Sequence, residues 1–467
     1  MPDNSTPKHH HNKMGTEPIG KLLLSMSLPA MFSMLIQALY NIVDSIYVAQ
    51  IGEHALTAVS LAFPVQNLMI AVSVGTGVGL NSLIARRLGE RREQEASAAA
   101  THGVLISLAE SLLFLLFGLF FCRMFFSAFT SDSTVIQMGV DYTSIVTIFS
   151  FGSFIQINLE KTLQATGNMF YPMVFQLIGA ITNIILDPIF IFGWFGLPAM
   201  GVTGAAVATV LSQACSCLFV LWFLFSDRVH VRISFRGYSG KIMLRVLTFG
   251  FCPFIIIAGD SVLIIALNTV LQNYGGAQGD MLIACATIVQ SYMQIVTLPL
   301  GGITSGTQPI LSFNYGAKNT DRIRKGEKEI AKMALLFCLV MFIISQTVSG
   351  VFVRLFTQNA EYIQLSVWAI KVFTFGIIPL ALQYSFVDGL TALGIVKVSV
   401  TLSVFRKLMF LVFTLALPAF FGATAAFYAE PIVDIFCGIV STIVFLSIIG
   451  KVLKKREQMP DGESLYS

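Results

Sequence analysis

The sequence is poor in charged residues. Asp, Glu, Lys and Arg make up 12% of the 467 residues, whereas 55% are hydrophobic and the mean hydropathy is +0.78. A chain of this size with so little charge is too apolar to be a soluble protein, so we expect lipid to be its solvent. The 29 basic and 25 acidic residues leave a net charge of +4, which says little by itself. The basic segment 226–245 is expected to fix topology and meet anionic lipid rather than to bind nucleic acid.

Metal-binding and catalytic patterns are also lacking. The seven cysteines lie in apolar segments without C-x-x-C spacing, so they predict neither a zinc site nor a redox pair. HExxH, GxSxG and Walker A motifs are absent, which argues against an enzyme and against a cofactor. The triplet His9 to His11 has no Cys or carboxylate cluster beside it, and we interpret it as part of a solvated tail.

Long apolar runs are what the chain has in abundance. A membrane-spanning helix needs roughly 20 apolar residues, and about twelve such runs alternate with short polar loops. The sequence therefore predicts an all-α polytopic membrane protein. The expected spans lie near residues 28 to 50, 56 to 82, 101 to 124, 135 to 159, 170 to 194, 202 to 225, 247 to 272, 282 to 312, 332 to 352, 365 to 390, 398 to 420 and 424 to 450.

The basic residues of the loops alternate between two sides of the membrane. Most of the 29 Lys and Arg residues fall on one side, in groups around 86–92, 228–245, 318–328 and 451–456. The other side holds only Arg123 and Arg354. By the positive-inside rule we expect both termini to be cytoplasmic, which agrees with an even number of spans. The first 21 residues are polar, so no cleavable signal is expected.

The chain matches itself at an offset of about 227 residues, which predicts two copies of one unit. Leu88-Gly89 corresponds to Tyr315-Gly316, and the pattern L-x-A-x-G recurs at Leu163 and Leu390. Six spans per copy make the repeats parallel, a transporter arrangement with a substrate site between the halves and alternating access. We expect a cytoplasmic tail (1–14), an N-lobe (15–225), a basic cytoplasmic linker (226–246), a C-lobe (247–452) and a cytoplasmic tail (453–467), with a central cavity between the lobes.

Helix-breaking and small residues also recur in the spans. Six prolines lie within or near the ends of apolar runs, at Pro64, Pro253, Pro299, Pro309, Pro379 and Pro418. Gly75-x-x-x-Gly79 and Gly302-x-x-x-Gly306 allow helices to approach closely. We interpret these residues first as packing and bending features, with a hinge that changes during transport as the alternative.

One buried acid stands out. Asp187 is the only charged residue in the fifth run, and a charge at this depth is costly enough to suggest function. Asn183 and Gln176 lie on nearly the same helical face, and Pro188 deprives the Ile184 carbonyl of its helical donor. These oxygens could coordinate Na⁺, a proton could serve instead, or Asp187 could bond to Asn183 only to hold helices together.

A second polar stripe lies in the first span. Gln37, Tyr40 and Asn41 precede Asp44 by seven, four and three residues, so all four share one helical face. The repeat does not duplicate these acids, since Thr414 occupies the position equivalent to Asp187. We therefore assign cation or proton coupling to the N-lobe.

Further charged residues interrupt the other spans. Gln156, Glu160 and Gln164 recur every four residues, and Glu160 is either a cavity acid or an acid that snorkels or pairs with Lys161. In the C-lobe Tyr384 and Asp388 are four residues apart. Asp260 and Asp388 are weaker candidates, and Arg406 and Lys407 could pair with Asp388, Glu430 or Asp434. The expected substrate-binding residues are Glu160, Tyr40, Gln37, Gln156 and Asp388.

Several segments resemble one known family, the multidrug and toxic compound extrusion (MATE) transporters, in particular their MepA-like and DinF-like bacterial branch. These segments are LYNIVDSIYVAQIG, RRLGE, LQATGN, NIILDPIFIFG with GVTGAAVATVLSQ, and TQPILSFNYGA. The resemblance implies a twelve-span exporter of a bacterial inner membrane, driven by Na⁺ or H⁺. It implicates Asp44, Asp187, Asn183 and Thr209 in the coupling site and Glu160 in drug binding. Thr166 departs from the acid that many relatives carry before Gly-Asn.

The expected function is secondary antiport of organic cations by a protein that acts as a monomer in the lipid bilayer. The coupling residues would be Asp44, Asn41, Asn183, Asp187 and Thr209, with Asp44, Asn183 and Asp187 as ligands if the ion is Na⁺. The alternative is a lipid-linked precursor flippase of the same superfamily. Arg406 and Lys407 are the only basic groups that favour it.

Overall fold

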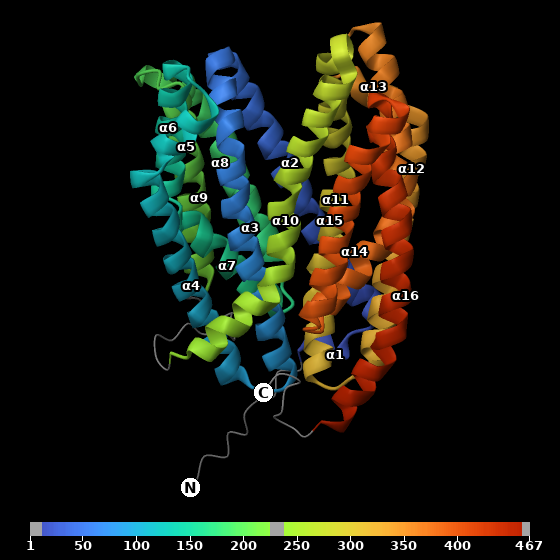
Figure 1. Cartoon of the computed structure of the whole chain (residues 1–467). Helices are drawn as coiled ribbons and strands as arrows, with labels where there is room; N and C mark the ends of the chain where they lie inside the picture. Colours follow the sequence, from blue (N-terminus) through green and yellow to red (C-terminus); the bar gives the residue numbers. More distant parts are fainter. Residues whose placement is uncertain (1–11, 225–237, 460–467) are drawn as a thin grey trace.

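The computed structural model describes residues 12–224 and 238–459, and all regular structure within them is helical (Figure 1). Eleven helices in these ranges are long and apolar enough to span a membrane. The pair α6 and α7, bent by 47°, supplies a twelfth span if it is counted as one. The predicted all-α membrane architecture is thereby confirmed.

We use the name N-lobe for the helices α1 to α9 and the name C-lobe for α10 to α16. In the N-lobe the bounds are α1 (Lys13–Thr16), α2 (Ile19–Ile51), α3 (Glu53–Gly89), α4 (Glu93–Phe120), α5 (Cys122–Phe129), α6 (Ser133–Ile148), α7 (Phe151–Ala165), α8 (Phe170–Phe192), η1 (Trp194–Gly196) and α9 (Val202–Leu224). In the C-lobe they are α10 (Gly240–Gly275), η2 (Gly276–Gln278), α11 (Gly279–Gly316), α12 (Thr320–Val353), α13 (Ala360–Phe373), η3 (Thr374–Gly376), α14 (Ile377–Ala392), α15 (Val396–Phe421), η4 (Ala423–Tyr428) and α16 (Ala429–Gln458).

The helices extend beyond the apolar runs that predicted them. α2 begins at Ile19 rather than near residue 28, and α16 continues to Gln458, because a helix can continue in polar sequence once its apolar part has crossed the lipid. α10 begins at Gly240, so the end of the expected linker is helical. Residues 226–237 of the linker and the triplet His9 to His11 lie outside the described residues.

The two lobes are joined by α3 against α10 and by α2 against α11, the labelled helices at the centre of Figure 1. Glycines make both contacts close. A Cβ added at Gly75 would lie 3.0 Å from the Phe254 Cβ, and one at Gly302 would lie 2.9 Å from the Met31 Cα. Since Gly302 is the repeat equivalent of Gly75, the same device serves both junctions. The packing role predicted for these glycines is confirmed.

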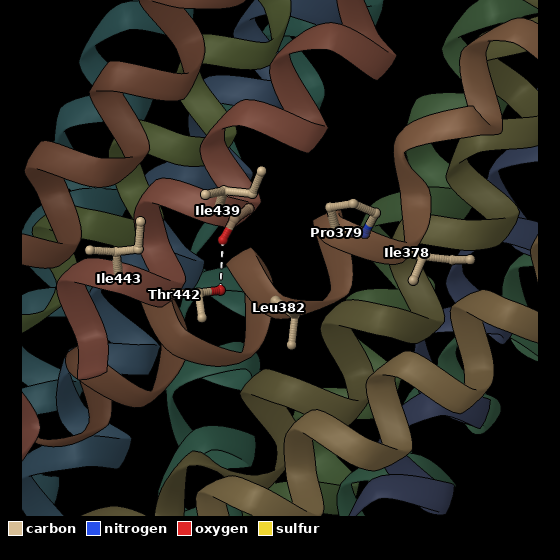
Figure 2. A pocket seen from close by; sticks show the side chains of 7 residues that line it. Ile378, Pro379, Leu382, Ile439, Thr442 and Ile443 are labelled. Atoms are coloured by element: carbon tan, nitrogen blue, oxygen red, sulfur yellow. Dashed lines mark hydrogen bonds between the residues drawn. The ribbon is translucent and has the colours of Figure 1, made fainter. Parts of the chain in front are cut away.

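Proline and glycine also shape the C-lobe. The segment from α13 to α14 is interrupted by η3, and Pro379 lies in the first turn of α14. Gly438 of α16 packs on that turn, where an added Cβ would lie 2.5 Å from the Pro379 carbonyl oxygen. The result is an apolar crevice of 270 Å³ between α14 and α16. Figure 2 shows the side chains that line it. The crevice has no charged lining residue, so it is separate from the polar clusters described below.

Polar contacts bind the lobes together at the end of the molecule near the termini. Arg456 Nη2 of α16 lies 2.9 Å from Glu90 Oε1, the residue after α3 in the other lobe. Within its own lobe Arg456 also donates to the Gly316 carbonyl at 3.1 Å. The guanidinium groups of Arg86 and Arg456 lie 4.8 and 5.3 Å from the Tyr315 ring centroid. We call Arg86, Glu90, Tyr315 and Arg456 the interlobe latch.

The short helix α1 closes the same end. Met14 is fully buried, and its carbonyl accepts hydrogen bonds from Asn314 Nδ2 at 3.0 Å and from Arg322 Nη2 at 3.1 Å. A Cβ added at Gly167 of the N-lobe would lie 3.1 Å from the Met14 Cγ. The first described residues of the chain are therefore held between the two lobes.

Candidate functional site

Asp187 lies in a buried polar cluster of the N-lobe. Asn183 and Asp187 are both fully buried on α8, and Asn183 Nδ2 donates to Asp187 Oδ1 at 3.3 Å and to Thr209 Oγ1 of α9 at 3.5 Å. The Asp44 carboxyl group of α2 is hydrogen-bonded to that of Asp187, and the Tyr40 hydroxyl to that of Thr209. Three helices thus bring together residues that the sequence had proposed on separate stripes.

This cluster has more acceptors than donors. Asp44 Oδ1, Asp187 Oδ2 and Asn183 Oδ1 are buried and have no hydrogen-bond partner among the described residues. Pro188 lies inside α8 and has no N–H, so the Ile184 carbonyl also lacks its helical donor. A buried oxygen without a donor is costly. A bound cation or proton would remove that cost, so the residues present fit either Na⁺ or H⁺.

The other residues of the first stripe lie less deeply. Tyr40, Asp44 and Gln37 are half-buried on α2, whereas the Asn41 side chain is exposed. Tyr142 of α6 also approaches Asp44, and its hydroxyl accepts a hydrogen bond from Gln66 Nε2 at 2.7 Å. Neither Tyr142 nor Gln66 belongs to a polar stripe in its own helix, so no pattern pointed to them.

Glu160 forms a second buried cluster. It is 2% exposed, and its carboxylate accepts hydrogen bonds from Gln156 Nε2 at 3.0 Å and Gln176 Nε2 at 3.2 Å. Glu160 therefore does not snorkel, and the neighbouring Lys161 donates instead to Gln164 Oε1 at 3.0 Å. Gln176, which the sequence grouped with Asn183, belongs to the Glu160 cluster.

The adjacent basic residues Arg406 and Lys407 of α15 both form ion pairs with acids. Arg406 Nη2 lies 2.6 Å from Glu430 Oε1 and 2.8 Å from Asp434 Oδ1. Lys407 pairs with Asp260, which was not among the three acids expected as its partners. Asp388 pairs with neither base and accepts a hydrogen bond from Thr304 Oγ1 at 2.5 Å. The structure thus selects Glu430 and Asp434 as the partners of Arg406 and leaves Asp388 facing a neutral donor.

Two acids inside the fold were missed at the sequence level, the half-buried Glu110 and the buried Glu327. Glu110 of α4 accepts a hydrogen bond from the Thr76 hydroxyl of α3, and Glu327 of α12 is 4% exposed with neither carboxylate oxygen paired among the described residues. Glu110 is the only acid within its predicted span, the same signal that singled out Asp187. Glu327 lies outside the predicted span, where an acid attracts no notice.

Comparison with known proteins gives the family. A family model described as MatE matches residues 29–189 and 257–416, one segment in each half of the chain. The chain belongs to the MatE family. The two matched segments fall in the two lobes, as expected for a repeated MatE unit. MatE proteins are membrane transporters, and catalytic activity is not indicated.

MatE relatives match over almost the whole chain. The multidrug export protein MepA of Staphylococcus aureus is 22% identical over 454 residues, which cover 95% of this chain and 97% of MepA. MepA of Staphylococcus haemolyticus is 23% identical with the same coverage. A solved outward-facing structure of a multidrug resistance MATE transporter superposes with a TM-score of 0.89 at 25% identity, covering 95% of this chain and 98% of that one.

Proposed function

We propose that this MatE protein exports organic cations by antiport with Na⁺ or H⁺. The observation that carries the proposal is the N-lobe cluster, where Asp44, Asp187 and Asn183 present buried oxygens without donors. Entry of Na⁺ or H⁺ satisfies these oxygens and neutralises the acids. The drug is then released on the outside, because a cationic drug and the coupling ion compete for negative charge in one lobe.

The same arrangement supports alternating access as part of the proposal. The coupling cluster lies within the N-lobe, and the interlobe latch joins the lobes only at the end near the termini. In the proposed cycle that end faces the cytoplasm of a bacterial cell and the described latch holds it closed. Opening it separates Arg456 from Glu90, and the monomer suffices because each chain holds both lobes.

The drug itself is proposed to bind beside Glu160. The buried Glu160 carboxylate is held by the neutral amides Gln156 and Gln176, so its negative charge is not cancelled by a direct ion pair. Asp388 likewise accepts from a hydroxyl group. Two such acids favour a cationic substrate.

A lipid-linked precursor flippase is the other function considered. It would need free basic groups for the phosphates of its substrate. Arg406 and Lys407, the two bases that favoured this reading, are each paired with carboxylates. This pairing weighs against the flippase.

The experiment is dye export from liposomes, with Na⁺ and pH gradients imposed separately. We expect one of the two gradients to drive ethidium export by the wild type. Asp187→Asn is expected to abolish gradient-driven export while the protein still inserts and binds ethidium. Asp321→Asn, the same change at an exposed acid on α12, is the matched control and should export normally. Gradient-driven export by Asp187→Asn at the wild-type rate would refute the assigned site.

A different result would overturn the proposed function as a whole. If neither gradient drives export of any organic cation by the wild type, antiport of cations is excluded. Movement of a fluorescent lipid-linked precursor between leaflets by the same protein would then establish the flippase.

A further inference from the structure

Lys161 is a buried base that the proposed cycle does not use. Its side chain is 9% exposed on α7, and its ammonium group donates to the neutral Gln164 Oε1 at 3.0 Å. No ion pair among the described residues joins it to a carboxylate. Glu160 and Asp388 are nevertheless close enough to act on it electrostatically. Burying an ammonium group without a direct counter-ion is costly, so its retention calls for an explanation.

The path of the Lys161 side chain is built into the fold. A Cβ added at Gly77 of α3 would lie 2.8 Å from the Lys161 Cγ and 3.5 Å from its Cβ. The alkyl stem therefore lies over a glycine that leaves room for it. Ile157, one turn earlier on α7, packs beside the same glycine. These contacts tether the stem, so the ammonium group has a restricted range.

Lys161 and Asp388 are equivalent positions of the two repeats. The two parallel repeats are related by a pseudo-twofold axis along the membrane normal. Equivalent positions of the two repeats can therefore be close in space only if both lie near that axis. Lys161 belongs to the N-lobe and Asp388 to the C-lobe, and they interact electrostatically. The ammonium group therefore lies at the junction of the lobes, between the Glu160 cluster and the acid on the opposite side.

We propose that Lys161 is a specificity-determining residue, a tethered cation that competes with the cationic group of the substrate for Glu160 and Asp388. This inference rests on the proposed function, because it assumes that the substrate places positive charge near these two acids. With Lys161 in place, the two carboxylates offer one net negative charge rather than two. A substrate with one positive charge is then balanced, and further positive charge is penalised.

The test is ligand binding by Lys161→Met, in which the stem over Gly77 is kept and the charge is removed. Three probes differ in charge: neutral triphenylphosphine oxide, the monocation tetraphenylphosphonium and the dication dequalinium. Calorimetry on the purified protein gives the dissociation constant of each. We expect Lys161→Met to bind the monocation roughly tenfold more tightly and the dication roughly a hundredfold more tightly, because the removed repulsion scales with charge. The neutral probe should be unaffected.

Two further variants separate charge from structure. Lys161→Arg keeps the positive charge and should bind all three probes as the wild type does. Lys397→Met, the same change at an exposed lysine of α15, should also leave binding unchanged. If Lys161→Met does not fold, Lys161→Gln provides the same loss of charge, and thermal unfolding of each variant identifies damage to the fold.

The outcomes are distinct. Equal changes for the neutral and cationic probes would show a structural role and overturn the inference, as would unchanged binding of tetraphenylphosphonium. A wild type that binds tetraphenylphosphonium but exports it under neither gradient would refute the proposed antiport. The ratio of the dissociation constants of Lys161→Met and the wild type would still decide the role of Lys161. Absence of binding by both proteins would overturn the inference.

Discussion

Arg456→Met is expected to shift the transporter towards the state in which the end near the termini is open. In the described state Arg456 contacts Glu90 at 2.9 Å and donates to the Tyr315 and Gly316 carbonyls at 3.0 and 3.1 Å. Glu90 keeps Arg86 at 3.4 Å and Arg87 at 2.5 Å when Arg456 is removed. The main loss is therefore the contact between lobes rather than the charge balance of Glu90.

The size of the shift between the closed and open states follows from the free energy of the lost contact between lobes. A charge-assisted contact of a buried arginine contributes about 2 kcal/mol, and about 1.4 kcal/mol corresponds to a tenfold change in an equilibrium. The ratio of open to closed molecules should thus rise roughly thirtyfold. Glu90→Ala removes the same contact between lobes, but it also strips a carboxylate from Arg86 and Arg87. It should open the transporter equally and lower its thermal stability more.

The assay is double electron–electron resonance between spin labels at Glu93→Cys and Asp321→Cys. Both positions are exposed, one at the start of α4 and the other at the start of α12. We expect Arg456→Met, Glu90→Ala and the double variant to increase the population at the longer label-to-label distance equally, because all three break the same contact between lobes. Lys455→Met, at the exposed neighbour of Arg456, is the control.

Two outcomes would refute this reasoning. The first is a distance distribution of Arg456→Met that matches the wild type. The second is an additive shift in the double variant, which would mean that Arg456 and Glu90 act independently of one another.

Two predictions concern other parts of the fold. Gly79→Ala places a methyl group against the Val246 carbonyl where α3 meets α10 and should lower the melting temperature in detergent, by overpacking of about 1 to 3 kcal/mol. The methyl group of Gly301→Ala meets nothing within 4 Å, so this variant should keep the wild-type melting temperature. An equal fall in melting temperature for both variants would refute the close-approach argument. The Thr134 backbone N–H donates to the exposed Asp132 and lowers the pKa of that carboxyl, so its capping of α6 is lost as the pH falls through the folded value. Asp132→Ser should remove this acid dependence from thermal unfolding, and persistence of the dependence would contradict it.

Contacts within one helix could be predicted from the sequence, because helical spacing fixes them. Asn183 and Asp187 are four residues apart and bond as expected, and Gln156 reaches Glu160 in the same way. The same geometry explains why Lys161 does not pair with Glu160, since consecutive residues point about 100° apart. Lys161 instead bonds to a residue three positions later.

Contacts between helices could not be predicted from the spacing of residues along one helix. The meeting of Asp44 with Asp187 was expected only from the resemblance to MATE transporters, and the bond of Gln176 to Glu160 was not expected. Arg456 and Glu90 are 366 residues apart, and no periodic pattern relates them. Such pairs depend on how whole helices pack, which the order of polar residues along one helix does not determine.

The position of α1 has a consequence for biosynthesis. Met14 is made before both residues that hold its carbonyl, since Asn314 and Arg322 follow it by 300 and 308 residues. At ordinary rates of translation α1 waits on the order of half a minute for its binding site to exist. α1 therefore reaches its native place long after its own synthesis, once the helices that carry Asn314 and Arg322 have been made.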